Sequence, residues 1–131
     1  RGVELLLQRG AGNNLQSSNG DTALMVAADQ GHERMVELLI RRGAEVNLQN
    51  SDGRTALMGA AHHGHERVVE LLLRRGARVN LQDSEGWTAL MRAAHQGHER
   101  IVDLLIRHGA EVNLQDSDGD TALMYAALLN R

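Results

Sequence analysis

Residues Asp52–Ser84 read DGRTALMGAAHHGHERVVELLLRRGARVNLQDS, and this stretch decides the fold because the chain repeats it on both sides. The blocks 19–51 and 85–117 align with it without gaps, and each pair of blocks agrees at 24 or 25 of 33 positions. Glycines recur at Gly20, Gly53, Gly86 and Gly119. Self-similarity at such a period is typical of a solenoid, in which each unit stacks on its neighbours because it cannot bury its apolar face alone.

The repeated unit resembles an ankyrin repeat, and the resemblance covers the whole chain. The residues that carry it are Gly53, Thr55-Ala56-Leu57, Ala60-Ala61, Gly64-His65, Val68-Val69, Leu71-Leu72-Leu73, Gly76-Ala77 and Val79-Asn80. The resemblance implies an all-α fold, an ankyrin-repeat solenoid of stacked helix-turn-helix units with short β-hairpin loops. Ala56 and Met58 stand where the family usually has Pro and His, so the Thr to His hydrogen bond typical of the family cannot form. The uniform repeats also fit an engineered or consensus-like array, whereas the Ala-Leu-Met departure favours a natural one.

The repeat boundaries predict one domain over residues 1–131. It comprises a partial repeat at 1–18, complete repeats at 19–51, 52–84 and 85–117, and a partial repeat at 118–131. Residues 3–11 align with residues 69–77, so we expect the chain to begin inside a second helix whose partner helix is missing, and we expect residues 121–129 to form a first helix. The leucines that we expect to be partly uncovered are Leu5, Leu6, Leu7, Leu123, Leu128 and Leu129. We interpret the chain as a segment of a longer array with frayed ends, since solenoids need polar capping units.

Local signals within the unit agree with two helices. Thr55 is a preferred N-cap residue for the first helix, and Gly64 suits the left-handed backbone just past its end. Glu66 opens the second helix, where a carboxylate complements the helix dipole. Arg75 lies in its last turn and Gly76 terminates it. The small pair Ala60-Ala61 keeps the first helix thin enough for close approach by neighbouring units.

Composition excludes several classes of function. The net charge of −3 and the pI near 6.2 argue against binding nucleic acid or an anionic membrane through bulk charge. There is no cysteine, and no apolar run is long enough to span a membrane. The sequence contains no pairing of nucleophile and base and no phosphate-binding glycine loop. We therefore expect an intracellular, monomeric, non-catalytic protein with no cofactor and no metal.

Comparison of the repeats separates shared positions from variable ones. The variable positions form three sets: Asp21, Arg54, Trp87 and Asp120 after the hairpin glycine; Val26, Gly59, Arg92 and Tyr125 within the first helix; and Asp29-Gln30, His62-His63, His95-Gln96 and Leu128-Leu129 at its end. The family resemblance implies that hairpin tips and first helices line a concave groove that holds partner proteins. We therefore predict a binding face for a protein or peptide partner made of Asp21, Asp29, Arg54, His62, His63, Trp87, Arg92, His95, Gln96, Asp120 and Tyr125.

Each of these residues also has a simpler explanation. Any one position can drift because nothing constrains it. Trp87 is of a type enriched at interface hot spots, yet a Trp after the hairpin glycine also shields the turn. Arg92 can pair with an acidic partner or with the nearby Asp118 or Asp120. The alternative function for the whole chain is a structural spacer in a longer array, with no binding site of its own.

Three further groups of residues also suggest possible sites. His62 and His95 should lie about 10 Å apart, one helix diameter, which is too far for one zinc ion. A basic ridge, defined as Arg41-Arg42, Arg74-Arg75 and Arg107-His108, complements the helix dipoles and alternatively offers a docking strip for an acidic partner. Asn47, Asn80 and Asn113 resemble sites of the asparaginyl hydroxylase that modifies ankyrin repeats. Hydrogen bonds from their side chains to the hairpin backbone are a sufficient structural explanation.

Overall fold

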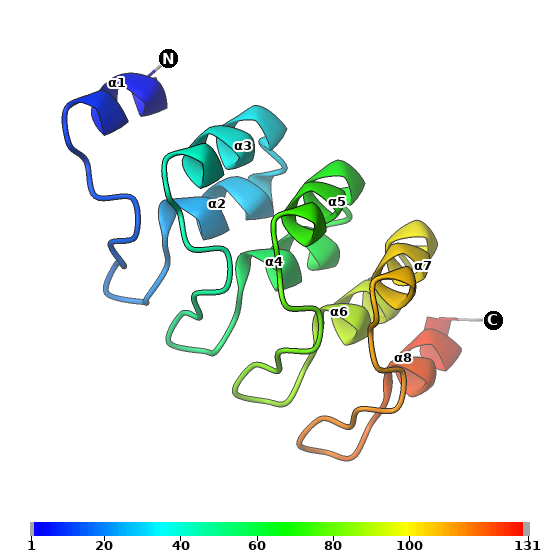
Figure 1. Cartoon of the computed structure of the whole chain (residues 1–131). Coiled ribbons are helices and arrows are strands. Elements are labelled where there is room, and N and C mark those ends of the chain that lie inside the picture. Colours follow the sequence, from blue (N-terminus) through cyan, green and yellow to red (C-terminus); the bar gives the residue numbers. More distant parts are fainter. Residues whose placement is uncertain (1, 130–131) are drawn as a thin grey trace.

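The computed structural model describes residues 2–129, and this part of the chain contains eight helices and no strand. The helices are α1 (Gly2–Gln8), α2 (Ala23–Gln30), α3 (Glu33–Arg41), α4 (Ala56–His62), α5 (Glu66–Arg74), α6 (Ala89–Gln96), α7 (Glu99–Arg107) and α8 (Ala122–Leu129). Figure 1 shows them in two rows, with the first helices α2, α4, α6 and α8 beside the second helices α1, α3, α5 and α7. The hairpin loops project from one side of the stack. The predicted all-α solenoid is confirmed.

The threonine at the start of each first helix acts as the predicted N-cap. Thr55 has an extended backbone, and its Oγ1 accepts a hydrogen bond from the Met58 N–H at 3.3 Å. Thr22 and Thr88 make the same bond at 3.3 Å and 3.2 Å. All three threonines are buried, so the bond also satisfies a hydroxyl that water cannot reach.

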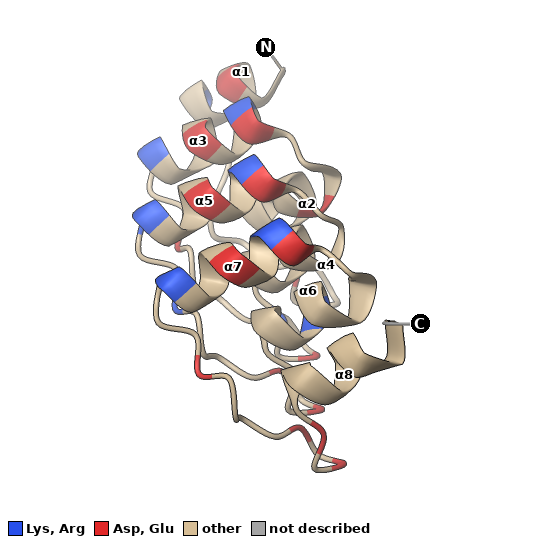
Figure 2. Ribbon diagram, turned by 90° about the vertical axis from the view of Figure 1, so that its right-hand side faces the viewer, with Lys and Arg blue, Asp and Glu red and all other residues tan. Residues whose placement is uncertain are grey.

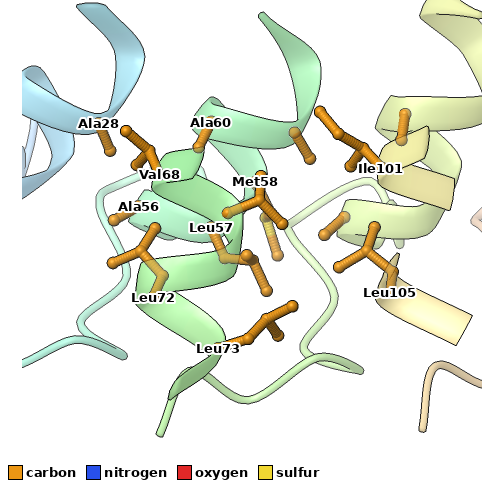
Figure 3. Close-up of a cluster of buried hydrophobic side chains, with 14 of the residues drawn as sticks. Ala28, Ala56, Leu57, Met58, Ala60, Val68, Leu72, Leu73, Ile101 and Leu105 are labelled. Atoms are coloured by element: carbon orange, nitrogen blue, oxygen red, sulfur yellow. The ribbon is translucent and has the colours of Figure 1, made fainter. Parts of the chain in front are cut away.

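The core runs through the stack as one continuous cluster. Figure 3 shows Leu57 and Met58 of α4 packed with Val68 and Leu72 of α5, and Ile101 of the next repeat lies in the same cluster. Alanines at the contacts between first helices are fully buried, with Ala28, Ala60 and Ala93 at 0% exposure. Their small side chains let consecutive first helices approach closely, as the sequence predicted. Complete burial of each Leu or Val contributes about 1.5–3 kcal/mol.

Polar side chains link each repeat to the next. The ring of His65 lies with Nε2 2.8 Å from the Asp29 carbonyl oxygen, and His98 reaches the His62 carbonyl in the same way at 3.0 Å. Asn47 donates to the Gly76 carbonyl at 3.0 Å and accepts from the Arg78 N–H at 2.8 Å. The prediction that this asparagine bonds to backbone is right, but the bonded backbone belongs to the following repeat. The Asn47 side chain points along the stack, because the loop after each second helix is stacked on the equivalent loop of the next repeat.

The hairpin tips are also stacked backbone to backbone. The N–H of Ser84 donates to the Asp52 carbonyl at 2.8 Å, and Ser51 and Ser117 repeat this contact one unit away. Gly53 adopts φ +75°, and a Cβ there would lie 2.9 Å from the Ser84 nitrogen. Glycine is needed for both reasons: the backbone is left-handed and the next hairpin is too close for a side chain.

The two ends of the stack expose side chains that are buried in its middle. Leu123 of α8 is 76% exposed, whereas Leu57 at the same repeat position is 2% exposed. Leu5, Leu6, Leu128 and Leu129 are exposed as predicted, and Leu7 is half-buried. Within residues 2–129, no helix combines the length and hydrophobicity needed to cross a membrane.

Candidate functional site

A groove of about 560 Å³ lies where the predicted binding face was expected, between hairpin tips and first helices. It contains six of the eleven predicted residues, namely Asp21, Asp29, Arg54, His62, His63 and Arg92. Its other lining residues are Asn19, Met25, Asn50, Ser51, Asp52, Thr55, Met58 and Gly59. The groove therefore carries carboxylates, cations and imidazoles above a floor of buried methionines.

Asp29 fills space that Gly59 leaves open. A Cβ at Gly59 would lie 1.8 Å from the Asp29 Oδ1, so the carboxylate of α2 rests directly on the glycine of α4. Burial, and to a lesser degree the nearby Asp21, raises the pKa of Asp29 above its ordinary value of 3.8. The positive charges of His63 and Arg54 oppose this rise. The groove thus holds a carboxylate close to Arg54 and His63, which suits a partner with polar and charged groups.

His62 lines the groove in surroundings that disfavour its charged form and so lower its pKa. Burial lowers its pKa below 6.5, and the positive charges of His63 and Arg92 lower the pKa further. Its Nδ1 is buried and has no hydrogen-bond partner within residues 2–129. The His62 and His63 rings meet edge to face, with centroids 4.8 Å apart.

Arg92 pairs with Asp83 of the hairpin that precedes its helix, which corrects the suggested pairing with Asp118 or Asp120. Its guanidinium lies 2.5 Å from the Asp83 carboxylate and 4.6 Å from the centre of the Trp87 ring. The Asp83 side chain is 2% exposed and also accepts hydrogen bonds from the N–H groups of Glu85 and Trp87. Asp83 begins the hairpin that leads to the helix of Arg92, so the carboxylate and the guanidinium meet within one hairpin and the helix that follows it.

Trp87, His95 and Tyr125 form an aromatic cluster beside the groove. The Trp87 ring centroid is 4.4 Å from that of Tyr125 and 5.3 Å from that of His95. Tyr125 is buried and its hydroxyl donates to Asp116. Burial and this carboxylate raise the pKa of Tyr125 well above its usual range. Tyr125 therefore packs against the Trp87 ring, and Trp87 is half-buried as a residue that shields the turn would be.

The remaining predicted residues lie at the edge of this cluster. Gln96 is exposed and its side chain contacts the His95 ring at 3.2 Å. Asp120 donates its backbone N–H to Asp116 at 2.9 Å, and the carboxylates of Asp116, Asp118 and Asp120 lie within 4.8 Å of one another. Burial disfavours the charged form of Asp116, but hydrogen bonds from Tyr125 and the hairpin backbone outweigh this and lower its pKa.

Three of the six residues of the basic ridge pair with acidic side chains of the same helices. Figure 2 shows Arg at the ends of α3, α5 and α7, with acidic residues one turn earlier. Arg41 lies 3.4 Å from Glu37, Arg74 3.5 Å from Glu70 and Arg107 3.0 Å from Asp103. These pairs follow from the four-residue spacing on a helix, and they reduce the ridge's attraction for an acidic partner.

Sequence comparison alone missed part of the groove. Asn50 lines it and donates to the Asp21 carboxylate at 2.9 Å, although it was not among the predicted residues. A signal was present, because the equivalent position holds Asp83 and Asp116 in the following repeats. Asn19 and Asp52, also in the groove, occupy another variable position, held by Glu85 in the third repeat.

Comparison with known proteins agrees with the repeat architecture. The sequence matches the family described as ankyrin repeats (three copies) over residues 1–83 and again over residues 69–131. No curated protein matches the chain. The two matched ranges together span all 131 residues. The chain therefore belongs to the ankyrin repeat family.

Proposed function

We propose that the chain is a non-catalytic protein interaction module that binds a protein or peptide partner on its concave face. Ankyrin repeats are generally protein–protein interaction modules. The observation that carries the proposal is the groove of about 560 Å³, which gathers six residues from positions that differ between repeats. Shared positions are instead mostly buried in the core or bonded between repeats.

Within this face, the residues divide into contact residues and supporting residues. Arg54 and His63 are exposed, and their side chains are free to reach a partner, whereas the exposed Asp29 keeps its carboxylate against Gly59. Trp87 and Arg92 form a rigid unit with Asp83, because the guanidinium is stacked on the ring and bonded to a buried carboxylate. A pre-formed rigid anchor loses little conformational entropy on binding, which favours affinity. The Tyr125 ring packs against the Trp87 ring of this anchor.

A peptide-display selection tests the proposal. The parent chain is compared with an Arg54→Ala, His63→Ala variant, which removes two exposed side chains of the groove without touching the core. The matched control is Arg67→Ala, Arg100→Ala, two exposed residues in the first turns of α5 and α7. Circular dichroism verifies that all three proteins have the same helix content.

We expect peptides selected on the parent to bind the control equally and to lose at least tenfold in affinity for the groove variant. Tenfold corresponds to about 1.4 kcal/mol, a reasonable loss for exposed contacts at an interface. Equal binding by all three proteins would refute the concave face as the site. Failure to select any peptide would instead favour a spacer within a longer array.

A further inference from the structure

The concave face presents three chemically different surfaces in a fixed order along the stack. The first complete repeat contributes the carboxylates of Asp21 and Asp29, and the second contributes the guanidinium of Arg54. The third contributes the Trp87 ring with Arg92 stacked on it. Asp21, Arg54 and Trp87 occupy the same position of three consecutive repeats. The face is therefore acidic, then basic, then aromatic, at intervals of one repeat.

The acidic surface carries negative charge that no ion pair neutralises in the described chain, residues 2–129. Asp21 accepts a hydrogen bond from the uncharged Asn50 amide at 2.9 Å. Burial raises the pKa of Asp29, and the negative charge of Asp21 adds to this rise, so the two carboxylates disfavour each other's charge. A cationic group from a partner would relieve this repulsion.

Arg54 is an exposed cation in the middle of the face. Its guanidinium forms no ion pair with any other residue between 2 and 129, whereas the guanidinium of Arg92 is held by the buried Asp83. A free guanidinium binds a carboxylate through two parallel hydrogen bonds. Asp29 and Asp52 line the same groove, and their charges disfavour a doubly charged phosphate. The anion that fits here is therefore a carboxylate.

Trp87 gives the third surface a large apolar ring. Its centroid lies 4.4 Å from that of Tyr125 and 5.3 Å from that of His95, and Arg92 lies over the ring at 4.6 Å. Because Trp87 is only half-buried, part of its surface stays accessible. A large apolar side chain of a partner would cover that part, and tryptophan is enriched where such contacts dominate binding.

The repeat spacing sets the distance between the partner's side chains. Packed helices lie about 8–10 Å apart. A polyproline II segment has three residues per turn and rises about 3.1 Å per residue, so every third side chain lies on one edge, about 9.3 Å from the last. Neighbouring side chains on one face of a β-strand are only about 6.6 Å apart. An α-helix would need about fifteen residues to reach all three surfaces, and isolated helices of that length are marginal.

We propose that the concave face recognises a peptide segment in the polyproline II conformation with a basic, an acidic and a large apolar side chain at every third position. The basic side chain contacts Asp21 and Asp29, the acidic one Arg54 and the apolar one Trp87. This inference rests on the proposed function, because it names the partner that the same face binds. The segment lies in either chain direction, since side chains decide the match.

Peptide display on the parent chain tests the predicted order. The library holds randomised peptides of about twelve residues, which is about four turns of polyproline II. We expect the selected peptides to carry a lysine or arginine, an aspartate or glutamate and a large apolar residue at every third position, with the acidic residue in the middle. The same selection on Arg54→Glu should enrich a basic residue in the middle.

A charge exchange between protein and peptide is the decisive measurement. One selected peptide, and its copy with the middle acidic residue replaced by lysine, are titrated against the parent and Arg54→Glu by fluorescence anisotropy. We expect each mismatched pair to bind at least about tenfold more weakly than the parent pair, because like charges meet, and the doubly exchanged pair to recover most of the loss. Arg54 is exposed and bonds to Asn50 through its backbone, so the substitution preserves the hairpin.

The acidic surface is tested by removing its charge without changing its shape. Asp21→Asn with Asp29→Asn should weaken binding of the selected peptide at least about fivefold, and added salt should reduce the difference. The matched control is Glu33→Gln with Glu66→Gln, which removes the same charge from exposed residues at the starts of α3 and α5. The control should bind as the parent does, and circular dichroism verifies that each variant keeps its helix content.

Several outcomes would overturn this inference. Peptides that need Arg54 and His63 but carry no ordered charges would leave the proposed function standing and refute the pattern. Enrichment at every seventh position would show a helical partner instead. A charge exchange without recovery would mean that Arg54 does not contact the acidic residue, and equal loss in the control would mean that the acidic surface is not the contact. If no peptide is selected, the proposed function fails as well.

Discussion

Asn47 and Asn80 each make two hydrogen bonds that cross from one repeat to the next. Asn80 donates to the Gly109 carbonyl at 3.2 Å and accepts from the Glu111 N–H at 2.8 Å. These bonds satisfy backbone groups at the end of the following second helix, which the helix itself leaves without partners. One side chain therefore fixes the spacing of two loops.

We predict that Asn80→Ala lowers the free energy of unfolding by about 1–3 kcal/mol, because it removes two hydrogen bonds. Urea denaturation monitored by circular dichroism measures the change. Asn113→Ala is the matched control, since Asn113 has the same repeat position but no such bond within residues 2–129. Asn113→Ala should change the free energy of unfolding by less than about 0.5 kcal/mol. Equal effects of the two substitutions would contradict this explanation.

His62 gives a second prediction, which concerns pH. Its pKa in the folded chain is below 6.5, because of burial first and the charges of His63 and Arg92 second. As the pH falls below 6.5, the unfolded chain binds a proton at this imidazole that the folded chain resists, so this residue lowers stability. The contribution of His62 to stability is fully present only above the pKa that its imidazole has in the unfolded chain.

We therefore expect the free energy of unfolding to fall between about pH 7 and pH 5 more steeply in the parent than in His62→Gln. Urea titrations of both proteins at several pH values in this range measure the two slopes. The other six histidines are common to both proteins, so the difference reports on His62. Identical slopes would show that the pKa of His62 is not lowered by folding.

Helix α4 differs from the other first helices in carrying a glycine at its centre. Glycine within a helix costs about 0.5–1 kcal/mol relative to alanine. At Gly59 the space above the backbone is filled by the Asp29 carboxylate of α2, only 1.8 Å from where a Cβ would lie. In the next repeat, Arg92 of α6 occupies the position of Gly59. The residue of the preceding first helix that corresponds to Asp29 is then His62 of α4. The groove is therefore shaped by pairs of neighbouring helices.

A double-mutant cycle tests this coupling between α2 and α4. In an Asp29→Ala background, we expect Gly59→Ala to stabilise the protein by up to about 1 kcal/mol, because only the helix preference of alanine remains. In the parent the same change should stabilise less or destabilise, since the carboxylate must move away from the new methyl group. Thermal and urea unfolding of the four proteins give the coupling energy. A coupling energy of zero would mean that Asp29 does not rest on Gly59.

At the scale of the whole molecule, stability is distributed along one dimension. Each repeat contacts only its neighbours, so the central repeat has support on two sides and the ends on one. Helix α5 has four buried residues, α8 has two and α1 has none among those described. The core shown in Figure 3 therefore belongs mainly to the middle of the stack.

We predict that backbone amides of α1 exchange hydrogen fastest among the helices, followed by those of α8. Those of α4 and α5 should exchange slowest, because opening them exposes the largest apolar surface. Hydrogen exchange followed by NMR or mass spectrometry at dilute protein concentration measures this order. Uniform protection from α1 to α8 would contradict a stack that loosens from its ends.

The sequence by itself determined the repeat, its two helices and most of its capping interactions. This was possible because these features depend on local preferences that recur three times in register: Thr55 as N-cap, alanines at the helix contacts and glycines at the hairpins. It also determined which positions vary, and the repeat geometry implied that they share one face. The exposure of leucines such as Leu6 and Leu123 followed from the same alignment.

Only the tertiary structure decided how the variable residues interact. Arg92 pairs with Asp83 and stacks on Trp87, and Tyr125 is buried against Asp116, because the side chains of one hairpin and the helix that follows it meet in space. The bonds of Asn47 and His65 to neighbouring repeats likewise depend on how the repeats are stacked. Such contacts join residues from different elements, and sequence spacing does not specify the orientation of their side chains.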